Sequence, residues 1–577
     1  MASVEAKHVD SALASDVDVL AKLGKKQVLK RRFGFWSLFA FAVCELITWE
    51  TVLALLSQGY DNGGPAGLVY GFIIAWSSTL SVYICISELA SMAPIACGQY
   101  FWVYMLAPKR YKKAASYIIG WLTSLAWVAT VATESLFAGT IIQGILVLNY
   151  PDYGYERWQG TLLTWAVILV NVLINVLTPG ALPKFEITIM ALHICGFVAI
   201  LATLLSTADI GTARSVWLTS LNEGGWSTQG LSYCVGFMGN VATFVGADAS
   251  VHMAEEVENA ALNIPRAIVA GMCINGVIGF AMMIVALYCL GDPTSVLETA
   301  TGFPFLQIFL NSVKSTAGAI GMGVIVLILT WMCALGITTT ASRMTWSFAR
   351  DKGTPGSRIL SRVSKRTKVP NFAVFTVAAI AALLVLIYIG SAVAFNDVIS
   401  LTITGFYGSY FLPCALLFWH RIKGHILPYG SSVSSAQETT TLDPMVGTAE
   451  GDVLHEKSST NKALFTAPEA ASGNGHAEVG HVEVKLIWGP WKIPGIIGII
   501  NNAYACFYMI FVIFWSVWPP ATPVQANTMN YSVVVTGGVM ILSAVWYYIR
   551  ARKVYDGPIL EEEVVDVARR AGSVVAL

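Results

Sequence analysis

Apolar runs of 18 or more residues alternate with short polar segments along most of the chain. A helix needs about 20 apolar residues to cross a hydrocarbon layer roughly 30 Å thick. Runs of this length, separated by Gly, Pro and charged clusters, predict about twelve membrane-spanning helices. We place these spans, numbered in chain order, at 35–57, 66–91, 116–146, 160–178, 185–206, 229–257, 266–290, 317–347, 371–391, 395–419, 494–517 and 531–549. The expected fold class is an all-α polytopic membrane protein.

Composition supports this fold class. Charged residues make up 12% of the 577 residues, whereas soluble domains carry roughly a quarter. The formal net charge is zero, so we expect no nucleic-acid partner. The ten cysteines lie in or beside apolar runs without zinc-ligand or disulfide spacing, and we interpret them as packing residues. No metal ion or other cofactor is expected.

The basic residues orient the spans. With the N-terminus on the cytoplasmic side, only Arg157, Arg214 and Lys314 of the 35 Lys and Arg residues fall on the outer side. Short cytoplasmic segments of membrane proteins carry such an excess of basic residues. The pattern predicts that both termini are cytoplasmic, and we expect the plasma membrane as the location.

The spans and polar segments divide the chain into six parts. Residues 35–206 would hold spans 1–5 as one transmembrane repeat. Residues 207–423 would hold spans 6–10 as a second repeat. The segment 424–485 is rich in Ser, Thr, Gly and Ala and has no apolar period, which predicts a disordered cytoplasmic loop. The remaining parts are a cytoplasmic tail at 1–34, spans 11 and 12 within 486–556, and a second cytoplasmic tail at 557–577.

Ionisable residues near the middle of a span are candidate functional groups. A charge at a helix centre costs at least roughly 2.5 kcal/mol, so it persists mainly where function needs it. Four such residues are Glu45, Glu134, His193 and Asp248, in spans 1, 3, 5 and 6. A buried protonated acid bonded to a neighbouring helix is the alternative for each carboxyl.

Span 6 is expected to unwind near its middle. Gly236, Gly239 and Gly246 interrupt it, and 246–250 has only small or polar side chains. Unwound backbone at membrane depth is tolerated where it lines a cavity, and its free amides and carbonyls then bind polar solutes. Alternatively, the glycines allow close helix packing. Span 1 has no internal Gly or Pro, so a break is less evident there.

An acidic run, Glu255, Glu256 and Glu258, follows the middle of span 6. We interpret it as a gate at the cytoplasmic end of the span or as a partner for Arg266, rather than as a substrate contact. This position at the end of a span leaves the run close to water, where charges cost less.

Three motifs resemble one transporter family. They are GGPAGLVYGFIIAWSSTLSVYICISELASMAPIACGQYFWVYMLAPKR at 63–110, GADASVHMAEEVENAALNIPRA at 246–267 and TTTASRMTWSFARDKGTP at 338–355. They are similar to the amino acid–polyamine–organocation (APC) superfamily, in its fungal branch of GABA, amino-acid and choline permeases. The resemblance covers about 30–423 and 486–560. Cys97 departs from it, because the branch has a glycine there, and 424–484 is an insertion.

The resemblance implies a LeuT-type fold of two inverted five-span repeats plus two peripheral helices. It places a substrate site between the unwound middles of spans 1 and 6. The implied lining residues are Cys44, Glu45, Leu46, Phe244, Gly246, Ala247 and Asp248. Glu134, Trp331 and Tyr407 are added from their depth alone.

The acidic character of these residues favours a substrate with a positive nitrogen, such as GABA, an amino acid, choline or a polyamine. Trp49, Phe244 and Trp331 would add cation–π contacts if they face the cavity. Span 1 lacks the glycine-rich break on which many relatives hold a carboxylate, which argues against carboxylate capture at that helix end.

Coupling to protons is suggested by His193, because a histidine titrates near neutral pH. By resemblance to the APC superfamily, His193 lies near the place where several sodium-independent members carry a basic residue. Thr338, Thr339 and Ser342 of span 8 would approach the same place. The alternative is a neutral histidine bonded within the bundle.

The expected function is a secondary active permease whose partners are a small solute, protons and the lipid bilayer. No P-loop, HExxH or GxSxG motif is present, which argues against an ATP-driven pump or an enzyme. A non-transporting nutrient sensor on the same fold is the competing interpretation, since fold does not settle function.

Overall fold

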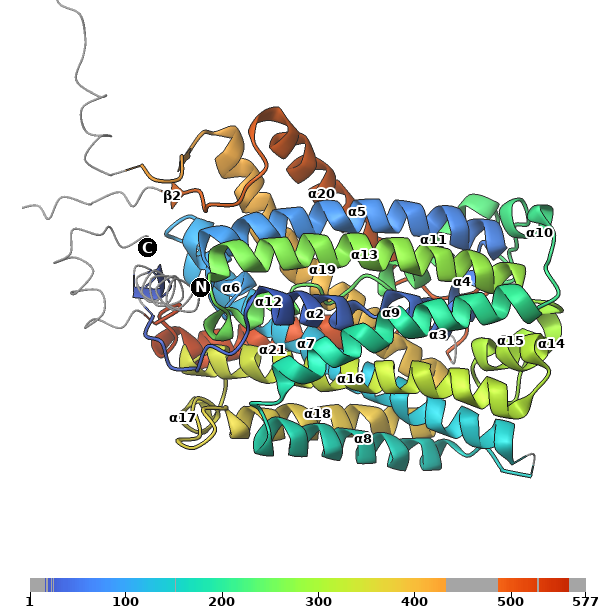
Figure 1. Ribbon diagram of the computed structural model, residues 1–577. Coiled ribbons are helices and arrows are strands. Elements are labelled where there is room, and N and C mark those ends of the chain that lie inside the picture. The colour runs from blue at the N-terminus through green and yellow to red at the C-terminus, as the bar shows by residue number, and fades with distance from the viewer. Residues whose placement is uncertain are drawn as a thin grey trace, which may run out of the picture.

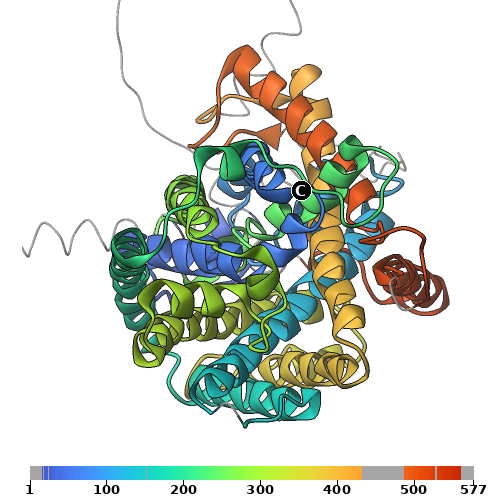
Figure 2. The same ribbon diagram turned by 90° about the vertical axis from the view of Figure 1, so that its right-hand side faces the viewer.

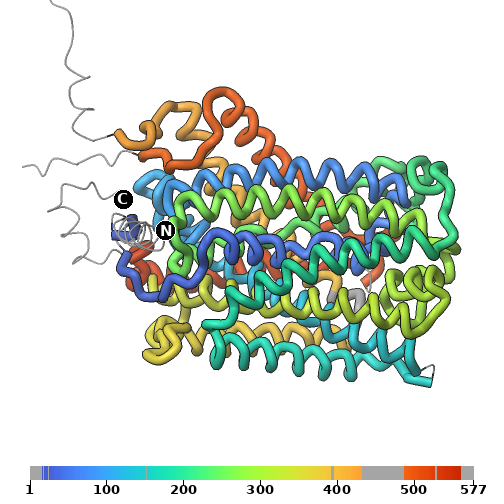
Figure 3. The backbone as a smooth tube through the Cα atoms, in the orientation of Figure 1, coloured from blue at the N-terminus to red at the C-terminus, as the bar shows by residue number. Residues whose placement is uncertain are grey.

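A computed structural model describes residues 16, 19–21, 23, 25–150, 152–431, 486–526 and 529–559, with only the backbone of 392–395. Within these residues, eleven helices are long and apolar enough to cross a membrane. They form one bundle with most axes running along its length (Figures 1 and 3). Ten of them are α5 (Gly64–Met92), α7 (Lys112–Asn149), α8 (Arg157–Leu177), α9 (Leu182–Thr207), α13 (Ala260–Tyr288), α16 (Thr316–Arg350), α18 (Asn371–Gly390), α19 (Ala392–Ile422), α20 (Gly495–Trp515) and α21 (Ser532–Ile549).

The eleventh helix, span 1, is interrupted. It consists of α2 (Phe35–Leu46), α3 (Thr48–Ala54) and a short continuation α4 (Leu56–Tyr60). Between α2 and α3, Ile47 has a left-handed backbone with φ 30° and ψ 49°. A β-branched residue rarely adopts this conformation, so the surrounding structure must hold it there. The break lies directly after Glu45 and Leu46.

Span 6 is interrupted as predicted. α11 (Gln229–Ala242) ends before an unwound segment at 243–248, and the chain continues as α12 (Ala249–His252) and the 3-10 turn η1 (Ala254–Glu256). Gly246 lies in the unwound segment with φ +104°, a conformation open to glycine but strained for other residues. This interrupted crossing, added to the eleven helices, confirms the prediction of about twelve spans.

The helix α7 lies inside the bundle, packed against α16, α19 and α8. The last two helices lie at the periphery, α20 against α19 and α5, and α21 against α7 and α19 (Figure 2). The buried residues of α21 are Ser532 and Ser543, so most of this helix faces outward. This arrangement agrees with two peripheral helices, while the division into inverted repeats stays a prediction.

Short elements cover the two ends of the bundle (Figure 1). One end carries α6 (Gln99–Leu106), α17 (Ser357–Leu360) and η4 (Ala551–Lys553), and we call it the terminal end, because the segments around Lys25 and Ile559 both lie there. The opposite end carries α10 (Ala213–Trp217), α14 (Pro293–Leu297) and α15 (Pro304–Val313).

The predicted loop at 424–485 lies mostly outside the described residues. Its first residues, 424–431, include β1 (Ile426–Leu427), which pairs in parallel with β2 (Leu486–Ile487) just after the predicted loop. This pairing brings the two ends of the predicted loop together. The described part of the predicted N-terminal tail, from Lys25 onward, is packed against the bundle, since Lys25 and Leu29 are both buried.

Candidate substrate site at two interrupted helices

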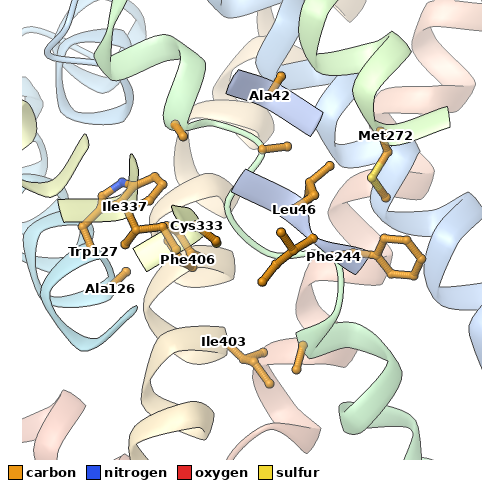
Figure 4. Packing of buried hydrophobic residues seen from close by; sticks show 14 of the residues in the cluster. Ala42, Leu46, Ala126, Trp127, Phe244, Met272, Cys333, Ile337, Ile403 and Phe406 are labelled. Carbon is orange, nitrogen blue, oxygen red and sulfur yellow. The ribbon is translucent and has the colours of Figure 1, made fainter. Parts of the chain in front are cut away.

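The breaks in spans 1 and 6 lie against each other. A Cβ atom placed on Gly246 would lie 3.8 Å from the carbonyl oxygen of Glu45. One turn further along, the Thr48 hydroxyl donates to the carbonyl oxygen of Thr243 at 3.2 Å. Figure 4 shows Leu46 beside the unwound segment, with Phe244 on one side and Trp127 on the other. The two backbone breaks therefore lie side by side, at the position where the substrate site is predicted.

The break in span 1 is bridged by Asn275 of α13. Its Oδ1 accepts from the amide of Thr48 at 3.2 Å, and its Nδ2 donates to the carbonyl oxygen of Val43 at 3.1 Å. One side chain thus replaces helix hydrogen bonds on both sides of Ile47. We did not predict this role, although an asparagine within an apolar run was a visible signal.

The break in span 6 is bridged by Tyr83 of α5. Its hydroxyl donates to the carbonyl oxygen of Phe244 at 2.8 Å and accepts from the amide of Ala247 at 3.2 Å. The predicted residues Phe244 and Ala247 therefore take part through their backbones. Among the described residues, the amides of Val245 and Gly246 donate no hydrogen bond.

The Glu45 carboxyl is the main polar side chain of this site. It is buried, and neither carboxyl oxygen has a hydrogen-bond partner within the described residues. Its Oε1 occupies the place where a side chain on Gly336 of α16 would begin. A buried polar group without a partner is costly, so this carboxyl is suited to receive a cation or a proton.

The surroundings of Glu45 are acidic. Glu134, Glu186 and Asp248 lie within electrostatic range of its carboxyl. The neighbouring Cys44 thiol donates to the carbonyl oxygen of Glu186 on α9 at 3.8 Å. Glu186 was not predicted as a site residue, because it lies near the start of a span. The Oε2 atom of Glu134 is also buried without a partner.

The Asp248 carboxylate is already engaged. Gln99 of α6 donates to its Oδ2 at 2.6 Å, and the Tyr410 hydroxyl of α19 donates to its Oδ1. His252 Nε2 lies 3.5 Å from Oδ2. Asp248 therefore ties α6 and α19 to the span 6 break. Gln99, Tyr410 and His252 were not predicted, since their role depends on this tertiary meeting.

The two aromatic residues predicted from depth contact other elements. The Trp331 indole donates to Asn171 Oδ1 of α8 at 2.9 Å. The Tyr407 hydroxyl lies 2.9 Å from Thr79 Oγ1 of α5, and its ring packs against Tyr508 of α20. Among the described residues, neither side chain bonds to the breaks. Tyr410, one turn after Tyr407, is the residue of α19 that reaches span 6.

The predicted coupling residues are separated. His193 Nδ1 lies 2.7 Å from Glu50 Oε1 of α3, and the Trp49 ring lies beside the imidazole. The three hydroxyls of α16 donate elsewhere: Thr338 to the Ala334 carbonyl, Thr339 to Asn175 Oδ1 and Ser342 to the Thr339 carbonyl. Within the described residues no hydrogen bond joins them to His193.

Ion pairs close the terminal end of the bundle next to the span 6 break. Arg350 binds both carboxylate oxygens of Glu255, at 2.7 and 3.1 Å, and Arg343 donates to Glu256 at 2.8 Å. These contacts fit the gate interpretation, but the partners are arginines of α16 rather than Arg266. We call these two pairs and the Lys25–Asp351 pair described next the terminal closure.

Asp351, which follows α16, joins both terminal segments. Lys25 pairs with its Oδ1 at 2.6 Å, and the amide of Ile559 donates to the same oxygen at 2.9 Å. Tyr100 donates to Oδ2 at 2.8 Å. Burial acts to raise the pKa of Asp351, but Lys25 and Arg350 outweigh it and hold that pKa below its ordinary value.

At the opposite end, a cavity of about 250 Å³ lies between α4, α11, α19 and α20. Gln58, Asp61, Gly239, Asp397 and Trp515 are among the residues that line it. Charge pairs join the elements next to the span 6 break at the terminal end, whereas the cavity at the opposite end lies beside α4 and α11, the parts of spans 1 and 6 away from those pairs. A site reached alternately from two sides would show this asymmetry in one of its states.

Comparison with known proteins agrees with this arrangement. The profile of the family described as amino acid permease matches residues 33–449. The chain belongs to the amino acid permease family. A choline transporter of Saccharomyces cerevisiae is 31% identical to this permease over 391 residues, 67% of this chain and 69% of the relative.

Two further relatives show the range of the family. A GABA-specific permease of Saccharomyces cerevisiae is 26% identical over 573 residues, 96% of this permease and 88% of the relative. A protein of Macrophomina phaseolina, provisionally named an amino acid/polyamine transporter, is 31% identical over 386 residues, 67% of this permease and 85% of the relative. The named substrates of these relatives all contain nitrogen.

Proposed function

We propose that this permease is a secondary active transporter that imports a small solute with a positively charged nitrogen. The observation that carries the proposal is the unpartnered, buried Glu45 carboxyl directly beside two interrupted helices. An ammonium group placed there would remove the cost of the buried acid, and the acid would select for cations. The relatives named for choline, GABA and amino acids or polyamines support this solute class.

A zwitterion suits the site better than choline or a polyamine. The amides of Val245 and Gly246 donate no hydrogen bond within the described residues, and a Cβ atom on Gly246 would lie 3.8 Å from the Glu45 carbonyl oxygen. Backbone amides at an unwound helix are good ligands for a carboxylate. A solute with an ammonium at one end and a carboxylate at the other, such as GABA or an amino acid, uses both groups. We therefore propose carboxylate capture on span 6 rather than on span 1.

Transport would proceed by alternating access with proton symport. The terminal closure seals one end, and the cavity of about 250 Å³ opens toward the other. We place the terminal end in the cytoplasm and the cavity outside, in the plasma membrane, because the basic residues gather on the terminal side. Import then begins with solute entry through the cavity.

Uptake into vesicles containing the purified permease tests the proposal. Under an inward proton gradient we expect accumulation of GABA or an amino acid, and weaker accumulation of choline. Glu45→Gln should abolish uptake of every amine. Saturable binding of a solute without accumulation under any gradient would instead indicate a nutrient sensor and contradict the proposal.

A further inference from the structure

A second buried acid lies apart from the Glu45 carboxyl and is paired with a histidine. Glu50 stands on α3, three residues after the left-handed Ile47, and His193 stands on α9. Glu50 Oε1 and His193 Nδ1 are 2.7 Å apart, with side-chain exposures of 1% and 0%. The rings of Trp49 and Phe197 cover the pair.

The pair is only half satisfied by the protein. Glu50 Oε2 and His193 Nε2 are both buried and have no hydrogen-bond partner among the described residues. A purely structural hydrogen bond would need only Glu50 Oε1 and His193 Nδ1. The two unpartnered atoms are a second carboxylate acceptor, Glu50 Oε2, and a ring nitrogen, His193 Nε2, that can accept or release a proton. The geometry therefore leaves room for a change in protonation.

Acidic side chains lie around the pair. Glu45, Glu134 and Glu186 are the acids of α2, α7 and α9 that lie near this region, and Cys44 and Cys333 are its thiols. Helices α13 and α15 also pack against α3 or α9, and no basic side chain of theirs contacts the pair within the described residues. His193 is thus the basic group that meets this group of acids.

We infer that Glu50 and His193 together bind the proton that is transported, at a site separate from the substrate site. With a proton on His193, the imidazolium donates Nδ1–H to the Glu50 carboxylate, and the pair is neutral. When that proton leaves to water on the cytoplasmic side, a neutral imidazole faces a carboxylate whose charge is no longer balanced in an apolar interior. The inference rests on the proposed function.

The position of the pair connects the proton to the movement of span 1. α3 is the half of span 1 beyond the break, and the pair ties it to α9. A neutral pair holds α3 in place, and loss of the proton weakens that hold. Ile47 is the point at which α3 can turn relative to α2. Release of the proton thereby favours rearrangement of the break that holds the solute.

Glu50→Gln tests the inference, because the amide keeps the shape and a hydrogen bond but removes the charge. In vesicles, accumulation driven by a proton gradient should fall at least tenfold, which is about 1.4 kcal/mol of coupling. Counterflow exchange of labelled for unlabelled solute, which needs no gradient, should stay within about threefold of wild type. His193→Gln should give the same pattern, and the double variant should be no worse than either single variant.

Glu45→Gln is the matched control, since it should abolish counterflow as well as accumulation. Unchanged gradient-driven accumulation in Glu50→Gln or His193→Gln overturns the inference. If Glu50→Gln does not fold, His193→Gln and the proton-to-solute flux ratio, measured with a pH dye inside wild-type vesicles, decide the question. Accumulation by the wild type with a sodium gradient alone refutes the inference and the proton symport, but not the import of a nitrogen-containing solute. Binding without accumulation refutes the transport function itself.

Discussion

At the scale of single residues, the site depends on glycines, because their missing side chains leave the space that its polar groups occupy. The Glu45 carboxyl fits only because residue 336 is a glycine, and the unwound segment of span 6 turns at a glycine with positive φ. Sequence reasoning identified Glu45 and Gly246 from their polarity and small size. It could not assign Gly336, because the need for a missing side chain appears only when α16 is packed beside α2.

Gly336→Ala should impair substrate binding. The new Cβ would overlap Glu45 Oε1 and displace the carboxyl, and overpacking of this kind costs roughly 1–3 kcal/mol. We expect a rise of about tenfold or more in the Kd of the transported amine, measured by binding to purified protein. Gly321→Ala on the same helix is the control, because a Cβ there meets nothing within 4 Å. Equal Kd values for the two variants would contradict this prediction.

Asn275→Leu should destabilise the fold around span 1. The change leaves the Thr48 amide and the Val43 carbonyl buried without partners, at a cost of about 1–3 kcal/mol each. The measurement is the Tm of the purified permease, which should fall by several degrees. Asn311→Leu on α15, an exposed site, should leave the Tm unchanged. A tolerated Asn275→Leu would mean that the break does not need this bridge.

At the scale of helices, the sequence predicted the spans well because membrane crossing is decided locally, by length and polarity. The break in span 6 was also visible, since glycines and small residues mark it. The break in span 1 was implied only by the family resemblance, because Asn275, which bridges it, lies on a helix more than 200 residues away. The Glu50–His193 pair and the partners of Asp248 could not be predicted for the same reason, because these residues meet only in the folded bundle.

The terminal closure should loosen when Asp351 loses its charge. Asp351→Asn leaves Lys25 buried without a counter-ion, and breaking a buried pair costs roughly 3–5 kcal/mol. Hydrogen–deuterium exchange of residues 25–33 should rise severalfold. Asp209→Asn, which removes an exposed ion pair with Lys314, is the control and should change nothing. Unaltered exchange in Asp351→Asn would show that other contacts suffice for closure.

The same closure should resist mild acid. The pKa of Asp351 is lowered, so its contribution to stability is complete above the ordinary aspartate value of about 4 and is lost only as the pH falls through the lower folded value. Exchange of residues 25–33, corrected for the intrinsic effect of pH, should be constant from pH 7 to pH 5. An increase across that interval would be inconsistent with a depressed pKa at Asp351.

At the scale of the whole molecule, the bundle is asymmetric along its length. Charge pairs and both terminal segments join the elements next to the span 6 break at one end, and a cavity of about 250 Å³ lies beside spans 1 and 6 at the other. Two peripheral helices, α20 and α21, pack against the outside of the bundle. Membership of the amino acid permease family and this asymmetry together support a transport cycle rather than a fixed channel.

The proposed orientation predicts which exposed positions react from outside the cell. Asp209 follows α9 at the opposite end, and Lys352 follows α16 at the terminal end; both are exposed. A membrane-impermeant thiol reagent applied to intact cells should label Asp209→Cys and not Lys352→Cys, above the wild-type background. After the cells are permeabilised, both should be labelled. The reverse order of labelling would invert the topology and the direction of transport.

The meeting of Lys25 and Ile559 at one carboxylate also bears on how the protein is made. Lys25 leaves the ribosome before Asp351, whereas Ile559 leaves it after α18, α19, α20 and α21 have been made. The carboxylate of Asp351 can therefore pair with the lysine as soon as α16 has been made, but the contact with the Ile559 amide must wait for these four later helices. Assembly of this end thus depends on both earlier and later parts of the chain.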